Sequence, residues 1–149
     1  MAVPDLIIND KSGQLVAVVE VKNRQDLTPD LAAKLRRNLL AHDALPQSPY
    51  FLLLSQEKGY LWTPKEEMDI EALPAYEFSM LEVLNAYLSE ELTGRRLRGD
   101  ELEIVVSYWL SDFTGPDSHS QRPQSIRKIF ERSGLEKVLT DGRVFSRAA

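Results

Sequence analysis

The feature that most constrains the fold is the apolar run over residues 15–22, which is rich in β-branched side chains. Residues 4–9 have the same character, and the segment between the two runs has turn composition, with Ser12-Gly13 at its centre. This pattern predicts an antiparallel β-hairpin. Because the second strand is apolar almost throughout, we expect it to be covered on both faces of the sheet.

The next segment predicts a helix and two further strands. Thr28 is a typical N-cap and Pro29 suits the first helical position, so we expect a helix over residues 29–43. The apolar run at 50–55 has strand length, and a short strand is predicted at 60–63. A strand, a crossover helix and a second strand together indicate a parallel pair.

The rest of the chain is predicted to be mainly helical. Residues 64–74 are acidic and irregular, which is typical of a surface connection. Asp100 and Glu103 have the spacing of a capping box, and Gly134 is suited to end a helix. Helices are therefore predicted near residues 79–92, 100–113 and 123–134.

Length and composition indicate one domain over residues 1–149, with a strand-rich part in 1–64 and a helical part in 65–149. Hydrophobic residues make up 43% and charged residues 28%, which excludes a wholly disordered or collagen-like chain. No apolar run reaches the ~20 residues of a membrane span and there is no signal-peptide pattern, so we expect no membrane partner. The absence of cysteine excludes disulfides and thiolate metal sites, and it fits a cytoplasmic protein.

Two charged side chains interrupt the apolar strand. Glu20 and Lys22 are two residues apart, so in a strand they project from the same face. An even-length turn centred between residues 12 and 13 places Asp5 opposite Glu20. We therefore expect Asp5, Glu20 and Lys22 to lie together on one face of the hairpin, with the β-carbons of the two acids ~5 Å apart.

This arrangement has a functional and a structural interpretation. Two carboxylates at this spacing repel each other, and a divalent cation between them would turn the repulsion into coordination. Mg²⁺ prefers oxygen ligands and is often held by one or two carboxylates together with waters and a phosphate. In the structural alternative, Asp5 is a polar residue at a strand start, and Glu20 and Lys22 form an ion pair at a strand end.

Pro4-Asp5, the hairpin and then Glu20-Val21-Lys22 resemble the PD-(D/E)XK nuclease superfamily, which has the restriction-endonuclease-like fold. The resemblance implies that Asp5, Glu20 and the backbone carbonyl of Val21 bind Mg²⁺ or Mn²⁺. It implies that Lys22 assists the hydrolysis of a phosphodiester. It also implies an α/β fold with a mixed sheet of hairpin, crossover helix and parallel strand, and it covers roughly residues 1–62.

The sequence departs from the family at its N-terminal end. A typical member has a helix and a strand before the Pro-Asp, and that helix often carries another acidic metal ligand; here three residues precede Pro4. Either these core elements are missing, or the helices predicted in 79–113 replace them in space. A missing outer strand would expose a hairpin edge, which favours pairing with another chain. We therefore expect a homodimer or a tight association that buries some of Leu81, Leu84, Trp109 and Phe113.

Any nucleic-acid contact is expected to be local, because the net charge is −5. The candidates are Asn23 and Arg24, directly after the motif strand, and Lys34 and Arg37 on the predicted helix that follows. The alternatives are a solvated loop for the first pair and a wet helix face for Lys34, Arg36 and Arg37. The densest basic cluster is Arg95, Arg96 and Arg98, for which a surface loop without a partner is the default interpretation.

Three functions follow from these features. The first is a metal-dependent nuclease that acts on DNA or RNA. The second is a catalytically inactive module that keeps the nuclease fold for binding or regulation, and both the missing N-terminal element and the acidic net charge favour it. The third is a helical interaction protein in which the three charged residues meet by accident. The position of Asp5 relative to Glu20 separates the first two from the third, and metal binding separates an active site from an inactive one.

Overall fold

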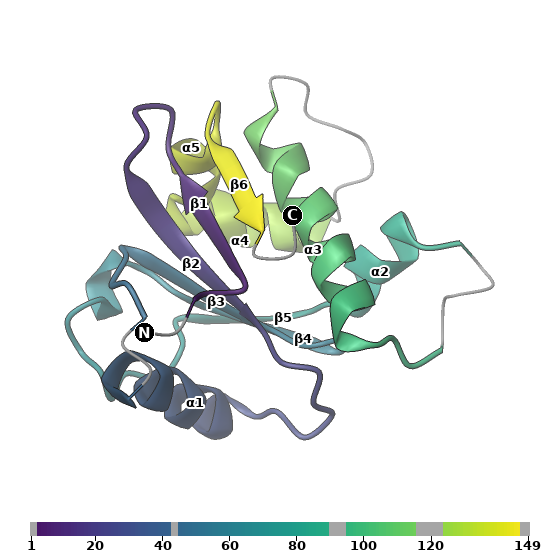
Figure 1. Ribbon diagram of the computed structural model, residues 1–149, viewed down its shortest axis with the longest axis horizontal. Coiled ribbons are helices and arrows are strands. Elements are labelled where there is room, and N and C mark those ends of the chain that lie inside the picture. The colour runs from purple at the N-terminus through teal and green to yellow at the C-terminus, as the bar shows by residue number, and fades with distance from the viewer. Residues whose placement is uncertain (1–2, 43–44, 90–94, 116–123, 147–149) are drawn as a thin grey trace.

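The computed structural model describes residues 3–42, 45–89, 95–115 and 124–146. It is an α/β fold in which helices flank a mixed six-stranded sheet (Figure 1). The α/β class and the mixed sheet agree with the sequence-based prediction. In the part of the chain that is described, no helix is long and apolar enough to cross a bilayer.

The predicted hairpin is present. Its strands are β1 (Leu6–Asn9) and β2 (Leu15–Val21), which pair antiparallel. Ile7 lies opposite Val18, so the register that the sequence predicts for the motif end of the hairpin is confirmed.

The register at the turn end of the hairpin differs from the prediction by one residue. Asn9 pairs with Leu15, where an even-length turn would have paired it with Val16. The Asp10 amide donates to the Gln14 carbonyl at 2.8 Å, which closes a loop with an odd number of residues. A β-bulge then takes up the extra residue, so the predicted pairing returns before the motif is reached.

The strand–helix–strand unit is also confirmed. Helix α1 (Pro29–His42) begins as predicted, with the Thr28 hydroxyl accepting the Leu31 amide at 3.2 Å. Strand β3 (Tyr50–Leu54) lies parallel to β2. All five of its side chains are buried, as expected for a strand covered on both faces.

Two further strands extend the sheet beyond β3. Strand β4 (Lys58–Trp62) was predicted at nearly the same place, whereas β5 (Tyr76–Ser79) was not predicted. Both pair antiparallel with the preceding strand of the sheet. The connection between them contains the short 3₁₀-helix η1 (Pro64–Glu66) and is otherwise irregular, as expected.

The helices of the C-terminal half are α2 (Leu81–Tyr87), α3 (Gly99–Thr114), α4 (Gln124–Ser133) and α5 (Leu135–Leu139). The first three correspond to predicted helices, and residues 90–92 and 123 of those predictions lie outside the described residues. Gly134 has a φ of 83°, in the left-handed region that favours glycine, and it separates α4 from the unpredicted α5.

The predicted capping box at the start of α3 is wrong. The N-cap is Arg98, two residues before the predicted Asp100, and its backbone N–H donates to the Glu101 carboxylate at 2.8 Å. Glu101, not Glu103, is therefore the acid one turn inside the helix. Both acids have suitable spacing in sequence, and the tertiary position of the preceding segment selects between them.

A last strand corrects the expectation of an open hairpin edge. Strand β6 (Arg143–Ser146) pairs antiparallel with β1, and the sheet order is β5-β4-β3-β2-β1-β6. The turn before β6 is tight, because a β-carbon on Gly142 would lie 2.4 Å from the Asn9 carbonyl oxygen. The outer edge of the hairpin is thus covered by the chain itself, and not by the helices of 79–113 or by a second chain.

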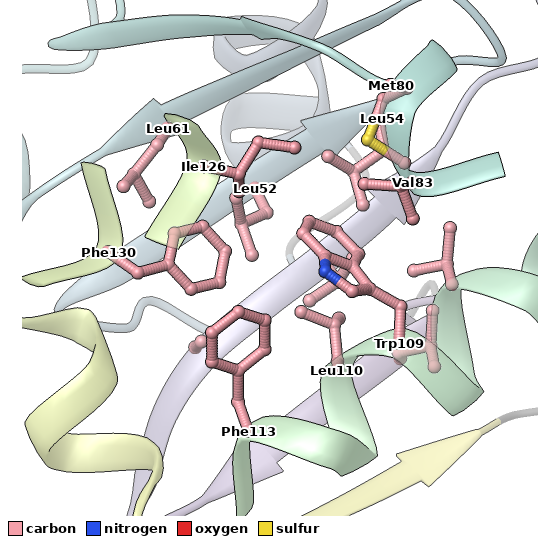
Figure 2. Packing of buried hydrophobic residues seen from close by; sticks show 14 of the residues in the cluster. Leu52, Leu54, Leu61, Met80, Val83, Trp109, Leu110, Phe113, Ile126 and Phe130 are labelled. Atoms are coloured by element: carbon pink, nitrogen blue, oxygen red, sulfur yellow. The ribbon is translucent and has the colours of Figure 1, made fainter. Parts of the chain in front are cut away.

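The larger core lies between the sheet and α2 to α5 (Figure 2). It contains three of the side chains expected at a subunit interface: Leu84, Trp109 and Phe113 are 4%, 0% and 2% exposed. Only Leu81 of the expected set is exposed. These side chains stabilise the fold itself, at about 1.5–3 kcal/mol for a fully buried large apolar group, so they do not form the expected interface.

The smaller core lies between α1 and the other face of the sheet, which we call the α1 face. Val18, Leu53 and Trp62 pack there against α1. Arg36 is also buried in this layer, contrary to the expected wet position. Its guanidinium lies 5.3 Å from the Trp62 ring centre and donates to the Asp69 carbonyl at 2.9 Å. Burial lowers the pKa of Arg36 from its usual value.

Candidate functional site

Asp5, Glu20 and Lys22 meet on the α1 face, where β2 ends. Because Val18 packs toward α1, Glu20 and Lys22 project from the same face at alternate positions. The confirmed register continues to Asp5, which comes directly before β1. Asp5 and Glu20 are 7% and 4% exposed, and the Lys22 side chain is 32% exposed. The structure therefore brings together the three residues that the sequence singles out.

Backbone hydrogen bonds fix both carboxylates. The Asp5 amide donates to Oε2 of Glu20 at 2.7 Å, and the Val21 amide donates to Oδ2 of Asp5 at 2.8 Å. Each acid thus accepts a bond from the strand that carries the other acid.

The Val21 carbonyl and the Lys22 ammonium complete this group. In a strand, the N–H and C=O of one residue point to the same side, so the Val21 carbonyl faces the side of the Asp5 carboxylate that its N–H reaches. The Lys22 amide points the other way and donates to the Leu54 carbonyl at 2.8 Å. The Lys22 Nζ lies 3.8 Å from Oε1 of Glu20. Three oxygen donors and one ammonium therefore lie around the end of β2.

This donor set fits one hard divalent cation. Two carboxylates and a carbonyl are all oxygen ligands, and Mg²⁺ is commonly bound by one or two carboxylates while it keeps several waters. Within residues 3–42, 45–89, 95–115 and 124–146, no group of three or more His, Cys, Asp and Glu side chains is placed to hold a metal. The oxygen donors around the end of β2 are of the ligand type that Mg²⁺ and Mn²⁺ prefer.

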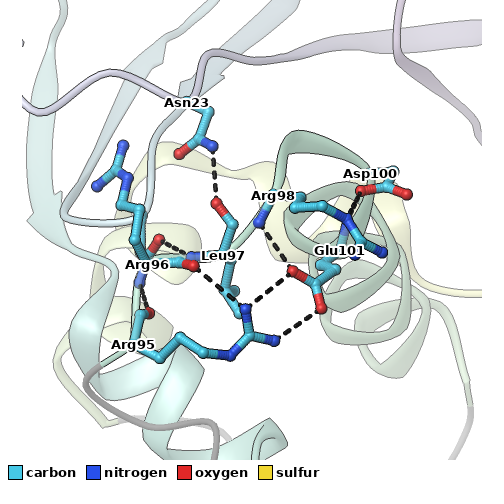
Figure 3. A network of polar contacts seen from close by, with 8 residues as sticks. Asn23, Arg95, Arg96, Leu97, Arg98, Asp100 and Glu101 are labelled. Carbon is cyan, nitrogen blue, oxygen red and sulfur yellow. Dashed lines mark hydrogen bonds and ion pairs between the residues drawn. The ribbon is translucent and has the colours of Figure 1, made fainter.

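Asn23, a predicted nucleic-acid contact, is engaged within the fold. Its Nδ2 donates to the Leu97 carbonyl at 2.8 Å (Figure 3). Gln56, just after β3, donates to the Arg95 carbonyl at 2.7 Å and accepts the Leu97 amide at 2.8 Å. These bonds hold residues 95–98, here called the 95–98 segment, against the carboxyl ends of β2 and β3.

Every arginine of the 95–98 segment is paired with a carboxylate. Arg95 pairs with Glu101 and Arg98 with Asp100 (Figure 3), and Arg96 pairs with Glu57. The hydrogen bond from Arg95, with a smaller effect from the Arg98 amide, lowers the pKa of Glu101 to about 2. The positive charge of the segment is therefore compensated locally, and the sequence cluster does not form an unpaired basic surface.

The other predicted nucleic-acid contacts are also accounted for. Arg24 makes two hydrogen bonds to Asp26 at 2.8 and 3.0 Å, and both residues are exposed. Arg37 pairs with Glu71 at 3.2 Å. Lys34 and Arg37 line a hollow of about 420 Å³ on α1, which neither Asp5 nor Glu20 lines. The structure thus places Lys34 and Arg37 on a separate surface.

Sequence reasoning missed Gln56, which connects the two halves of the chain. The residue is buried although it is polar, and its partners lie about forty positions further along the chain. The only local signal is a polar residue directly after the apolar run of β3, and a turn explains that signal equally well.

No protein-family model, curated protein or solved structure matches this chain. The resemblance to the PD-(D/E)XK superfamily therefore depends on the residues themselves. Its support is the common position of Asp5, Glu20 and Lys22.

Proposed function

We propose that the chain is a metal-dependent, nuclease-like protein of the PD-(D/E)XK type that hydrolyses phosphodiester bonds of DNA or RNA. One observation carries this proposal. Asp5 and Glu20, fifteen positions apart, lie side by side and buried at the end of β2, and the Lys22 Nζ is 3.8 Å from Glu20. Two carboxylates with an ammonium beside them supply the ligand type and the positive charge that metal-dependent hydrolysis of a phosphodiester uses.

The topology supports a restriction-endonuclease-like arrangement. The motif hairpin, the crossover helix α1 and the parallel strand β3 follow in the order that the family resemblance implies. In the family a strand precedes the Pro-Asp, and here β6 occupies the sheet position beside β1. In this proposal, a strand from the C-terminal end of the chain takes the place of the N-terminal strand.

The residues divide the chemistry between them. Asp5, Glu20 and the Val21 carbonyl would hold Mg²⁺ or Mn²⁺, which when bound polarises the phosphate and lowers the pKa of a coordinated water. The backbone bonds to the two acids keep their side chains in place before a substrate arrives. The Lys22 ammonium stabilises the negative charge that develops on the phosphate oxygens.

A catalytically inactive module is the second candidate, and a specific observation favours it. Both acids accept backbone N–H groups, so they stabilise the hairpin even without an ion. In addition, the described residues supply only these two acids at the site. A module that keeps this fold for binding or regulation would need neither metal nor turnover.

Nuclease assays separate the two candidates. We expect purified protein to cut single- or double-stranded DNA or RNA with Mg²⁺ or Mn²⁺, with little turnover in Ca²⁺ and none in EDTA. Lys22→Ala should keep metal affinity and lose the rate, whereas Glu20→Gln should lose both. Lys65→Ala and Asp30→Asn change exposed charges elsewhere and serve as matched controls. Cleavage that survives in Lys22→Ala would contradict the mechanism, and no cleavage of any substrate would favour the inactive module.

A further inference from the structure

Part of the α1 face carries no helix in the described chain. Helix α1 packs over β2, β3 and β4. Over β1 and β6, the helices α3, α4 and α5 pack on the opposite face, and α4 and α5 are seen behind these strands in Figure 1. Phe145 on β6 pairs with Ile7 and is 42% exposed, which is unusual for a large aromatic side chain in a sheet.

This open area is continuous with the candidate metal site. Asp5, Ile7 and Asn9 alternate along one edge of the hairpin, so they project from the same face at steps of ~6.6 Å. Phe145 lies opposite Ile7 and Arg143 lies opposite Asn9. We call Ile7, Asn9, Arg143 and Phe145, with Lys11 at the hairpin tip, the β1–β6 strip. The strip begins at Ile7, the next residue after Asp5 on the same face, and it ends at the side chains of Lys11 and Arg143.

The cations of the strip differ from most arginines of the molecule. In the described part of the chain, neither Lys11 nor Arg143 makes an ion pair or a side-chain hydrogen bond, whereas every arginine of the 95–98 segment has a carboxylate partner. Lys11, Arg143 and Phe145 line one hollow of about 260 Å³.

Two acids, Asp10 and Asp141, also line that hollow. Oδ1 of Asp10 accepts three hydrogen bonds within its own turn, from the Ser12 amide and hydroxyl and from the Gln14 amide. That carboxylate is therefore used to close the hairpin loop. Among the described residues, the Asp141 side chain makes no hydrogen bond or ion pair, so its one negative charge stands in the hollow against the two positive charges of Lys11 and Arg143.

We infer that the β1–β6 strip binds a single-stranded segment of nucleic acid. One unpaired base stacks on Phe145, and the backbone phosphates on either side lie at Arg143 and Lys11. An exposed ring beside unpaired cations is the combination that binds single strands, because every base has a face that stacks whereas duplex bases are already stacked. The role of the strip in guiding a strand toward Asp5 and Glu20 rests on the proposed nuclease function; binding itself does not.

Fluorescence anisotropy in EDTA tests the strip without the metal chemistry. The probes are short labelled oligothymidylate and oligouridylate, with a duplex of matched length as competitor. We expect Phe145→Ala and Phe145→Leu to weaken binding about tenfold, since leucine keeps an apolar side chain but not the stacking ring. Arg143→Ala should lower affinity and reduce the slope of log K against log[salt] by about 0.7.

Matched controls come from the opposite face. Tyr108→Ala removes an exposed aromatic ring on α3, and Arg132→Ala removes an exposed arginine on α4 that has no ion pair in the described chain. Neither variant should change the affinity for the oligonucleotide by more than about twofold, because neither removes a stacking contact or a phosphate contact of the strip. Circular dichroism melting verifies that each variant is folded.

The outcomes separate the strip from the proposed nuclease. No binding of either single strand, tighter binding of the duplex, or equal losses in Phe145→Ala and Tyr108→Ala would overturn the inference. If the wild type cleaves with Mg²⁺ but Phe145→Ala binds and cleaves normally, the inference about the strip is wrong and the nuclease proposal stands. If the strip variants lose binding and no metal-dependent cleavage occurs, the inference that the strip binds a single strand is confirmed and the nuclease proposal fails.

Discussion

Gln56 connects the sheet to the 95–98 segment, and its removal should measurably destabilise the fold. Gln56→Ala leaves the amide of Leu97 buried without its acceptor, which costs about 1–3 kcal/mol. Loss of the bond to the Arg95 carbonyl, which lies nearer the surface, adds about 1 kcal/mol. The free energy of unfolding should therefore fall by about 2–4 kcal/mol.

Urea unfolding followed by tryptophan fluorescence measures this change, since Trp62 and Trp109 are both buried. Gln47→Ala is the matched control, because the Gln47 side chain is exposed and donates to the Glu67 carbonyl at 3.2 Å; its effect should stay within about 0.5 kcal/mol. Hydrogen exchange should show a faster amide at Leu97 in the Gln56 variant only. Equal unfolding midpoints for the two variants, or an unchanged Leu97 amide, would show that Gln56 does not hold the 95–98 segment in place.

Three further predictions concern the charged and buried polar groups. Without metal, Glu20→Gln should change the free energy of unfolding in urea by no more than about 1 kcal/mol, because it relieves repulsion from Asp5 and also removes the ion pair with Lys22 at 3.8 Å; a larger loss of stability would contradict this. Arg36→Ala should cost about 2–4 kcal/mol and Arg37→Ala less than about 0.5 kcal/mol in the same assay, because only Arg36 is buried; similar values would count against its structural role. Burial, with a smaller effect from Glu77, raises the pKa of Tyr60 to about 12, so stability should fall as the pH rises from about 10 toward 12. Tyr60→Phe should remove that fall in alkaline melting curves, and an unchanged pH dependence would show that another group causes it.

The local elements of the fold were predictable from sequence because their signals are local. Turn residues, an N-cap at Thr28 and apolar runs of strand length define the hairpin, α1 and β3. The position of Asp5 beside Glu20 followed from the two-residue period of strands. This prediction was correct although the predicted turn was wrong, because the bulge near Val16 restores the register before the motif.

The long-range elements were not predictable, because the interactions that define them join residues far apart in the sequence. Strands β5 and β6 have four residues each, and their pairing partners, not their own patterns, determine that they are strands. The bonds of Gln56 join two loops that no periodicity relates. Apolar residues expected at a dimer interface, such as Trp109, instead fill the core beneath a sheet whose edge β6 already covers, and dimerisation itself stays a prediction.

Calorimetric titration with Mg²⁺ and Mn²⁺ shows whether the acids at the end of β2 form a metal site. We expect saturable binding to the wild type and to Lys22→Ala, and loss of that binding in Asp5→Asn and in Glu20→Gln. Both amide variants keep an oxygen that can accept the backbone N–H, so the hairpin should remain folded. No binding to the wild type, or binding that survives in both amide variants, would show that Asp5 and Glu20 do not form a metal site.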